Sequence, residues 1–497
     1  MSEMSIEDLE IEQLRARCQQ LVEEGGHLEF AYAWFPEEAD QPEVRYIVHP
    51  ASSAGLQIWR CHPGQGAIPS LADIAPLVSW YEREISDMCG VRFEGYPEAV
   101  PLIFLPGTHV SAPVLNAAGI EPVLQYEPLA YELPEIGGPD RDDIQVLPFG
   151  PVRADVAESA QFVFFYIGEA ILHYHAQLFF KHRGMEKRFE GKPSNLGMVL
   201  AERVSGVGSL CHALAYSQAV EQAASCVVPA RAQAMRVILA ELERLYNHLH
   251  YLGHLCHTTT LKVGEAQGKY LEELAKQINS RVSGNRLLRN VIIPGGLRHE
   301  PQLEGLTFDL QKLQDEFAVY ARMLETSTPH LDRLLTTGVL TRQAAFDEGA
   351  TGPIERASGS NRDLRRDQTY SGYAQLVVYE TVKQAGDAHA RQQVRIAEIE
   401  NSLDLIEQVM NTLPSGPIRV PCIPPDNSEG LGWAESPRGS LYYAVHIGRD
   451  GRLARVKIKS PSFSNWRVFP LTVYDSNMMD YAINEASFGL TMAGCDR

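Results

Sequence analysis

The sequence predicts an α+β protein, and three patterns lead to this class. Segments rich in aromatic and β-branched residues lie within residues 28–61 and predict strands. From about residue 190 to 280, apolar residues recur at three- and four-residue steps, which predicts long helices. Residues 162–180 and 441–458 resemble pairs of strands joined by turns. We therefore expect a small α+β domain followed by a mostly helical domain with peripheral β-hairpins.

The first elements are predicted to be a helix, three strands and a second helix. Residues 6–25 have helical apolar spacing with acidic solvent faces. Ser70 has a side chain suited to cap a helix, which would end at Gly90. The expected strands cover residues 28–35, 44–48 and 57–61.

A segment rich in proline, glycine and acidic residues, 134–145, predicts a linker between domains at 1–133 and 146–497. A hairpin is expected at 162–180, with its turn at Gly168 and Glu169. Further helices are predicted at 308–336 and 372–412, and a second hairpin at 441–458. The apolar stripe of the main helix consists of Met235, Leu239, Leu242, Leu245, Leu249 and Leu252.

Composition excludes several classes of protein. The formal net charge of −19 disfavours nucleic acid or an anionic membrane surface as the main partner. No apolar run reaches the roughly 20 residues that span a bilayer, and the acidic N-terminus lacks a signal-peptide core. The eight cysteines form no CxxC pair, so the chain contains no self-contained iron–sulfur motif. We expect a cytoplasmic protein that associates with the membrane through partners.

A glycine-rich segment, Glu202–Tyr216, precedes an apolar helical run. It resembles the first metal-ligand motif of [NiFe]-hydrogenase large subunits, Arg-x-Cys-Gly-x-Cys. In this chain Ser205 and Gly208 occupy the two cysteine positions. The resemblance implies a hydrogenase-like framework without those ligands.

Two further resemblances extend over most of the chain. Trp80–Val91 followed by Gly95-Tyr96-Pro97 is similar to the signature of the smaller hydrophilic subunit of respiratory complex I. An ordered set of motifs from Gly150 to Arg497 resembles the large subunit of energy-converting membrane-bound [NiFe] hydrogenases, including the formate hydrogenlyase type, and the larger core subunit of complex I. Its members are 150–158, 181–187, 228–232, 238–245, 294–298, 352–359, 363–367, 435–439, 461–463 and 496–497.

The resemblance implies a metal site that this chain has lost. A nickel–iron centre requires soft thiolates, which four family cysteines supply. The corresponding positions hold Ser205, Gly208, Thr491 and Gly494. We therefore expect no metal and no nickel–iron centre in this chain. The degenerate nickel–iron or quinone positions, which are the candidate cofactor-binding residues, are Ser205, Gly206, Gly208, His212, Thr491 and Gly494.

The complex I resemblance is also incomplete at the quinone site. The family's headgroup-binding histidine and tyrosine correspond to Ala157 and Gly206, whereas Glu158 matches a hydrogenase-type glutamate associated with proton transfer. Several charged residues lie in sequence segments that we expect to be buried. They form either a structural lattice of ion pairs or the lining of a cavity with a proton relay. The candidates for the relay are Arg153, Glu158, His182, Arg203, Arg356, Arg438 and Asp480.

A dense group of potential metal ligands is interpreted as structural. His250 and His254 are four residues apart and His254 and His257 three, which places them on one helix face. Leu249 and Leu252, between them, belong to the core stripe, and His248 and the Cys256–His257 pair recur in hydrogenase relatives outside the metal site. We therefore expect structural histidines and no metal centre.

The resemblance implies a subunit of a membrane-associated oxidoreductase complex of the NADH-quinone oxidoreductase or hydrogenase type, a class associated with quinone binding and NAD binding. The expected partners are a small [4Fe–4S] subunit and membrane subunits of antiporter-like and anchor type, on the inner face of the cell membrane. No nucleic-acid partner is expected.

Three functional hypotheses follow. In the first, a quinone or another small acceptor occupies the old cavity and receives electrons, coupled to ion translocation; a polar cavity lined by Arg153, Glu158, His182 and Arg438 would favour it. In the second, the subunit is a non-catalytic scaffold or coupling element, which a cavity filled by side chains would favour. The third is a working hydrogenase that recruits Cys211 and Cys495.

Overall fold

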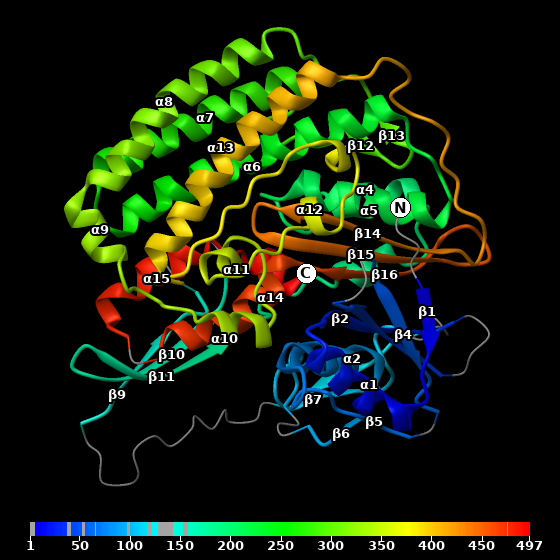
Figure 1. Ribbon diagram of the computed structural model, residues 1–497. Coiled ribbons are helices and arrows are strands. Elements are labelled where there is room, and N and C mark those ends of the chain that lie inside the picture. Colours follow the sequence, from blue (N-terminus) through cyan, green and yellow to red (C-terminus); the bar gives the residue numbers. More distant parts are fainter. Residues whose placement is uncertain are drawn as a thin grey trace. The chain divides into compact units, whose positions relative to one another are not determined.

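The chain forms two compact units, one mixed and one built around long helices (Figure 1). The computed structural model describes residues 5–36, 41–51, 55–64, 66–96, 100–116, 121–127, 143–152, 158–474 and 476–497. The first unit comprises residues 1–142, 177–182 and 347–349, and the second comprises 143–176, 183–346 and 350–497. The α+β class is confirmed, whereas most of the predicted linker, 134–142, lies outside the described residues.

The first unit is organised around a four-stranded sheet of order β1-β4-β3-β2. The three predicted strands are confirmed, because alternating aromatic and aliphatic side chains such as Phe30, Tyr46 and Trp59 are buried along them. The elements of this unit are β1 (Ser5–Asp8), α1 (Ile11–Glu23), β2 (His27–Trp34), β3 (Glu43–His49), β4 (Gln57–Cys61), β5 (Ile68–Pro69), η1 (Pro76–Val78), α2 (Ser79–Cys89), β6 (Phe93–Glu94), β7 (Thr108–Val110) and β8 (Leu124–Tyr126).

Two predictions for this unit were wrong in detail. Residues 5–8 are a strand parallel to β4 rather than the start of the first helix, because the edge of β4 offers backbone partners that outweigh local helical spacing. Ser70 does not cap α2, which begins nine residues later; its Oγ donates to Oε2 of the buried Glu82 at 2.6 Å. The end of α2 at Gly90 is confirmed, since this residue adopts the left-handed conformation at φ 71°.

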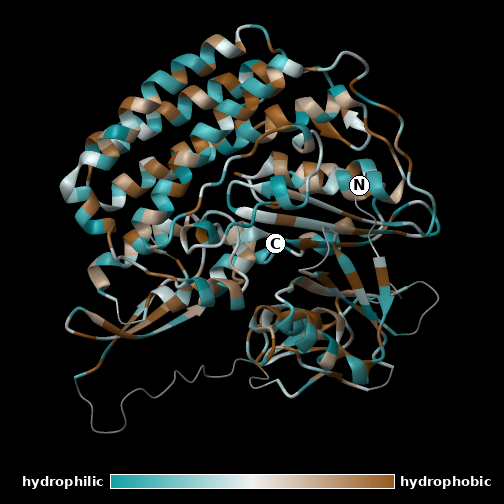
Figure 2. Ribbon diagram, in the orientation of Figure 1, coloured by the Kyte–Doolittle hydropathy of each residue, from teal (hydrophilic) through white to brown (hydrophobic). Residues whose placement is uncertain are grey.

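Long helices form the largest layer of the second unit. In Figure 1, α6 (Ala230–Thr258), α7 (Lys262–Ser283), α8 (Leu306–Thr326) and α13 (Ala388–Thr412) pack against one another. Gly253 and Gly268 bring α6 and α7 into backbone contact, because a Cβ on Gly268 would lie 2.5 Å from the Cα of Gly253. Brown apolar and teal polar positions alternate along these helices in Figure 2, as amphipathic spacing requires.

A three-stranded antiparallel sheet lies within the same unit and carries α5 (Ser209–Ala223). It consists of β14 (Glu429–Ser436), β15 (Gly439–Ile447) and β16 (Leu453–Lys459), of which the last two are the predicted second hairpin. Every residue of β15 is buried, so this sheet belongs to the core. Sequence reasoning missed β14, because Gly430 and Gly432 weaken its strand pattern.

The remaining elements of the second unit are short. The first predicted hairpin is confirmed as β10 (Gln161–Ile167) and β11 (Ala170–Gln177), with β9 (Gln145–Phe149) beside β10. The others are α3 (Met185–Phe189), α4 (Ser194–Ala201), β12 (Ile292–Ile293), β13 (Gly296–Leu297), α9 (Thr328–Leu334), α10 (Arg342–Asp347), α11 (Pro353–Ala357), α12 (Leu364–Asp367), η2 (Tyr373–Gln375), α14 (Pro461–Val468), η3 (Phe469–Thr472), η4 (Met478–Asp480), α15 (Tyr481–Phe488) and α16 (Met492–Asp496).

The predicted helix at 372–412 begins later than expected. Asp387 caps α13 by accepting a hydrogen bond from the Ala390 amide at 2.8 Å. Gly386, just before this cap, has φ 66°, and a Cβ there would lie 2.1 Å from the Leu340 carbonyl oxygen. A backbone of this kind cannot continue a helix, so the prediction was wrong for residues 376–387. The run at 308–336 is divided into α8 and α9, which Ser327 separates.

Within the part of the chain that the structure describes, no helix combines the length and apolar character needed to cross a membrane.

Gly432 sets the distance between α5 and β14, and substituting it should destabilise the second unit. A Cβ at this position would lie 2.1 Å from the Ala215 carbonyl oxygen and 2.4 Å from the Ala219 nitrogen. Because backbone atoms cannot move aside as side chains can, we expect Gly432→Ala to lower the free energy of unfolding by about 1–3 kcal/mol in urea titrations. Gly206→Ala is the control, since its nearest contact would be 3.6 Å away. Equal stability of the two variants would contradict this packing.

Candidate functional site

The two degenerate ligand motifs lie together, and Arg183 joins them. Its guanidinium donates to the carbonyl oxygens of Arg203 at 3.0 Å and Val204 at 2.6 Å, the first two residues of the first motif. The same group donates to the Ala493 carbonyl at 2.9 Å, within the second motif and 310 residues further along the chain. The structure therefore brings together Ser205–Gly208 and Thr491–Gly494, as the resemblance to hydrogenases implied.

The first motif leads into α5, whose N-terminus is held by a buried carboxylate. Glu243 of α6 accepts hydrogen bonds from the amides of Leu210 at 2.8 Å and Cys211 at 2.9 Å. These are donors that the first turn of a helix leaves without intrahelical partners. Burial raises the pKa of Glu243 above its ordinary range. The helix end beside Gly208 is therefore already occupied by a side chain of the protein.

The second motif forms the short helix α16. Thr491 caps it by accepting from the Gly494 amide at 3.1 Å. Glu158 accepts from the amides of Met492 at 2.5 Å and Ala493 at 3.1 Å. The hydrogenase-type glutamate thus lies directly against the second motif.

Arg438 and His212 complete the site. Arg438 donates through Nε to the Gly489 carbonyl at 2.8 Å and through Nη1 to Oδ1 of Asn247 at 2.9 Å. Its Nη2 has no hydrogen-bond partner among the described residues. Burial, together with Arg183 and Arg438, lowers the pKa of His212 to about 3, so the ring is neutral and its Nδ1 hydrogen-bonds the Tyr443 hydroxyl at 2.7 Å.

The two cysteines near the motifs are both buried. Burial raises the pKa of Cys211 and of Cys495 well above the ordinary thiol value, and Glu243 adds to the effect on Cys211. Thiolates, not thiols, bind metals, so both residues are disfavoured as ligands in this environment. In the described part of the chain, no three His, Cys, Asp or Glu side chains are arranged to hold a metal ion.

Arg356 lies in a buried lattice of charges next to this site. It contacts Glu398 at 2.7 Å, Glu435 at 3.0 Å and Asp363 at 3.6 Å. The lattice joins α6, α11, α12, α13 and β14. Its members are Glu241, Arg244, Arg356, Asp363, Arg365, Glu398 and Glu435, each buried. Arg356 is interior, as its sequence context indicated, and its contacts are those of an ion-pair lattice.

The lattice has one carboxylate more than it has guanidiniums. Arginines lower the pKa of Glu241, Asp363 and Glu398 below the ordinary range. Burial and the nearby carboxylate of Asp363 raise the pKa of Glu435 to about 7 despite its contact with Arg356. Glu435 is therefore the member that carries a proton below neutral pH.

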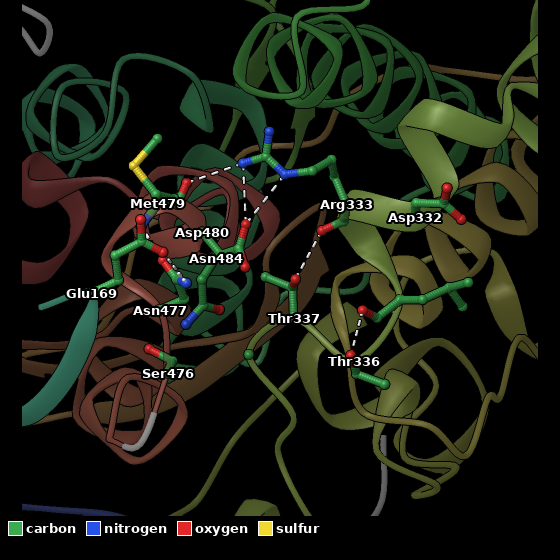
Figure 3. Close-up of a pocket in the computed structure, with 12 residues that line it drawn as sticks. Glu169, Asp332, Arg333, Thr336, Thr337, Ser476, Asn477, Met479, Asp480 and Asn484 are labelled. Carbon is green, nitrogen blue, oxygen red and sulfur yellow. Dashed lines mark hydrogen bonds and ion pairs between the residues drawn. The ribbon is translucent and has the colours of Figure 1, made fainter.

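Asp480 occupies a different place. It accepts from Arg333 Nε at 3.2 Å and Nη2 at 3.1 Å, in a cavity of about 500 Å³ (Figure 3). Asn477 donates to Glu169 at 3.0 Å on the same lining. None of the other candidate site residues lines this cavity. The described contacts of Asp480 are therefore with Arg333 and the cavity, and none of them joins it to the motif residues.

Of three other residues predicted for the proton relay, one is exposed, one belongs to the first compact unit and one lies outside the described residues. Arg203 is not interior: its side chain is 53% exposed, because the end of α4 turns it to solvent while its carbonyl faces Arg183. His182 belongs to the first compact unit, where its amide donates to the Phe179 carbonyl at 3.1 Å. Arg153 lies outside the described residues.

Comparison with known proteins agrees with this geometry. Family models match residues 9–119 (respiratory-chain NADH dehydrogenase, 30 Kd subunit), 183–290 (nickel-dependent hydrogenase), and 271–429 and 422–497 (respiratory-chain NADH dehydrogenase, 49 Kd subunit). The chain is 31% identical over 409 residues to formate hydrogenlyase subunit 5 of Escherichia coli, covering 80% of this chain and 71% of that protein. The chain belongs to the family of hydrogenase and complex I large subunits.

Other members of this family match at similar levels. Membrane-bound hydrogenase subunit alpha of Pyrococcus furiosus is 32% identical, covering 71% of this chain and 87% of that one. An NADH-quinone oxidoreductase subunit of Gluconacetobacter diazotrophicus is 29% identical, covering 86% of this chain and 79% of that one. Among solved structures, a chain of the archaeal membrane-bound sulfane sulfur reductase is 26% identical with a TM-score of 0.68, covering 72% of this chain and all of that one.

The histidines of α6 lie beside carboxylates or stack on one another. His248 is buried and lies 2.8 Å from Oε2 of Glu398. His250, His254 and His257 stack along the helix, with ring centroids 6.3 Å and 6.2 Å apart. His250 and His257 face Glu272 and Glu265 of α7 at 3.0 Å and 3.1 Å.

Sequence reasoning missed two arginines that position the second motif. Arg395 donates to the carbonyls of Ser487 at 3.3 Å and Phe488 at 2.9 Å, at the end of α15. Arg391 donates to Oγ of Ser487 at 2.9 Å. Both are buried on α13, four residues apart. Two arginines at this spacing among apolar helix positions are the signal that could have indicated them.

Arg183→Lys should loosen both motifs without unfolding the chain. A lysine ammonium cannot reach three carbonyls of two separate segments as the guanidinium fork does. Since a hydrogen bond from a charged donor contributes about 1.5–3 kcal/mol, we expect amide hydrogen exchange to accelerate at 203–208 and 491–494 and nowhere else. Arg322→Lys, on the exposed side of α8, is the control. Unchanged exchange at both motifs would contradict the role of Arg183.

Glu435 should make stability fall as the pH rises toward neutral. Its folded pKa of about 7 exceeds the ordinary value of 4.5, so between these values the folded chain holds a proton that the unfolded chain releases. We expect the free energy of unfolding of Glu435→Gln, relative to wild type, to rise by about 2–3 kcal/mol as the pH increases from 5 to 8 in denaturant titrations. The control is Glu407→Gln on the exposed face of α13. A stability difference between Glu435→Gln and wild type that does not change with pH would contradict the raised pKa of Glu435.

Proposed function

We propose that this chain is the large subunit of a membrane-associated, complex-I-like oxidoreductase that works without a nickel–iron centre. In this proposal, a [4Fe–4S] cluster on a partner subunit delivers electrons to a small acceptor held between the two motifs. Membrane subunits of antiporter-like and anchor type hold the chain at the inner face of the membrane and couple the reaction to ion translocation. The assignment to an oxidoreductase complex is supported by relatives named as subunits of formate hydrogenlyase, NADH-quinone oxidoreductase and membrane-bound hydrogenase.

The residues at the old metal site do not fit nickel and iron. The four ligand positions hold Ser205, Gly208, Thr491 and Gly494, of which none offers a thiolate. Thr491 is also engaged, as the cap of α16. No step of the proposed reaction therefore passes through such a centre.

Arg438 carries the proposal of an acceptor site. Its Nε and Nη1 are fixed by Gly489 and Asn247, which leaves the Nη2 group oriented and available as a donor. A fixed cationic donor stabilises an oxygen or sulfur atom that gains negative charge on reduction. The neutral His212 and the Glu158 carboxylate border the same region, since both interact electrostatically with Arg438.

The names of the similar proteins suggest two chemical classes of electron acceptor. Quinone is suggested by the NADH-quinone oxidoreductase subunits, and sulfane sulfur by the structure of the sulfane sulfur reductase. In either case the acceptor takes two electrons from the cluster of the partner subunit and two protons from solvent or side chains.

A scaffold or coupling element is the second candidate, and one observation favours it. Glu158, Arg183 and His212 all make hydrogen bonds to protein groups, as expected for a filled interior. A redox-inactive subunit of this kind would transmit motion or charge to membrane subunits and would tolerate changes at Arg438 that preserve the fold.

The test is reduction of acceptors by the purified complex with a reduced electron donor. We expect reduction of a soluble ubiquinone analogue or of polysulfide, and no hydrogen evolution. Arg438→Gln should lower kcat/KM about 10²–10³-fold, the usual loss for a positioned donor, while the complex stays assembled. Arg322→Gln is the matched control. Unchanged turnover in Arg438→Gln would favour the scaffold, and hydrogen evolution would overturn the proposal.

A further inference from the structure

Two of the eight cysteines differ from the rest in their exposure. Cys226 and Cys422 are half-buried, whereas the other six are buried. The residues on either side of them are also open to solvent: Val227 is 83% and Ile423 82% exposed. These two thiols are therefore the ones that a dissolved reagent can reach.

The two accessible thiols are neighbours in space. Cys226 lies in the connection between α5 and α6, and Cys422 lies between α13 and β14. The Cys226 Sγ is 3.9 Å from the carbonyl oxygen of Pro421, the residue before Cys422. In addition to burial, the adjacent Cys226 thiol raises the pKa of Cys422, as expected for neighbouring sulfurs. A pair this close, from segments almost 200 residues apart, meets the first requirement for a disulfide.

The backbone on both sides of the pair is held in place. The Cys226 amide donates to the Glu221 carbonyl at 2.8 Å, which ties it to the end of α5. On the other side, the Val420 amide donates to the Gly295 carbonyl at 3.0 Å. A Cβ on Gly295 would lie 3.1 Å from the Cβ of Cys422, so this glycine packs directly behind the thiol. The proximity of the thiols is thus built into the fold.

We propose that Cys226 and Cys422 are a redox-active dithiol that a low-molecular-weight disulfide converts into an intramolecular disulfide. The Cys226 thiolate attacks one sulfur of the reagent, forms a mixed disulfide and releases one thiol. Cys422 then attacks the Cys226 sulfur and releases the second thiol. Two protein thiols are oxidised, one reagent disulfide is reduced to two thiols, and no further oxidant is needed.

The order of attack follows from the surroundings of the two sulfurs. Burial and the adjacent Cys226 raise the pKa of Cys422 above the ordinary thiol value. Glu221 acts in the same direction and Arg236 against it. Because only a thiolate attacks a disulfide, Cys422 is the poorer first nucleophile. It is suited to resolve the mixed disulfide, where its partner sulfur is already within reach.

The site is better suited to oxidation than to metal binding. Among the described residues no third His, Cys, Asp or Glu completes a ligand set with this pair. The other ionised groups near Cys422 are Glu221 and Arg236, which occupy each other in a buried ion pair at 2.5 Å. The disulfide would join two connections of the second unit that otherwise meet only through non-covalent contacts.

The experiment treats the full-length chain, in its complex, with oxidised glutathione and maps the cysteines by differential alkylation and mass spectrometry. We expect a peptide cross-linked between Cys226 and Cys422, reversed by dithiothreitol. The six buried cysteines are the internal control and should be alkylated only after denaturation. Free thiols at both positions, or glutathione on both without a cross-link, would overturn the proposal.

Single variants separate the two roles. Cys422→Ser should accumulate glutathione on Cys226, because nothing resolves the mixed disulfide. Cys226→Ser should react at least about tenfold more slowly at Cys422, since the thiol with the raised pKa must then attack first. Equal rates in the two variants would contradict the assigned order, and a cross-link that persists in either variant would rule out this pair.

Discussion

A buried lattice of charges fixes the second unit of the chain. Arg356 contacts Glu398 of α13 and Glu435 of β14, and Arg365 contacts Glu241 of α6. Removing one of the arginines would leave uncompensated carboxylates away from water, which costs far more than the pair contributes. The lattice therefore sets the relative positions of helices and sheet. Arg438 follows Glu435 by three residues, so the lattice also holds the backbone of the candidate site in place.

The site itself is a hydrogenase-like framework with changed contents. Arg183 joins the two motifs, and Glu158 lies against the second. The four ligand positions no longer offer thiolates, and the helix end at Gly208 is satisfied by Glu243. We propose that such a site keeps its charged residues but holds no nickel and iron. This combination is why an acceptor bound by Arg438 is the function that the residues support.

The sequence predicted elements that depend on local pattern and missed those that depend on distant partners. The strands around Phe30, Tyr46 and Trp59 and the long helix α6 followed from periodicity. β14 was missed because its glycines serve contact with α5 rather than strand formation. Asp480 was grouped with the site on charge alone, and no local signal shows that Arg333 lies beside it.

We propose that this large subunit functions without nickel and iron of its own. The most direct measurement is the metal content of the purified complex by inductively coupled plasma mass spectrometry. We expect iron at about four atoms per complex, from one [4Fe–4S] cluster on a partner subunit, and no stoichiometric nickel. One nickel per complex would contradict this proposal and would mean that other residues have rebuilt the metal site.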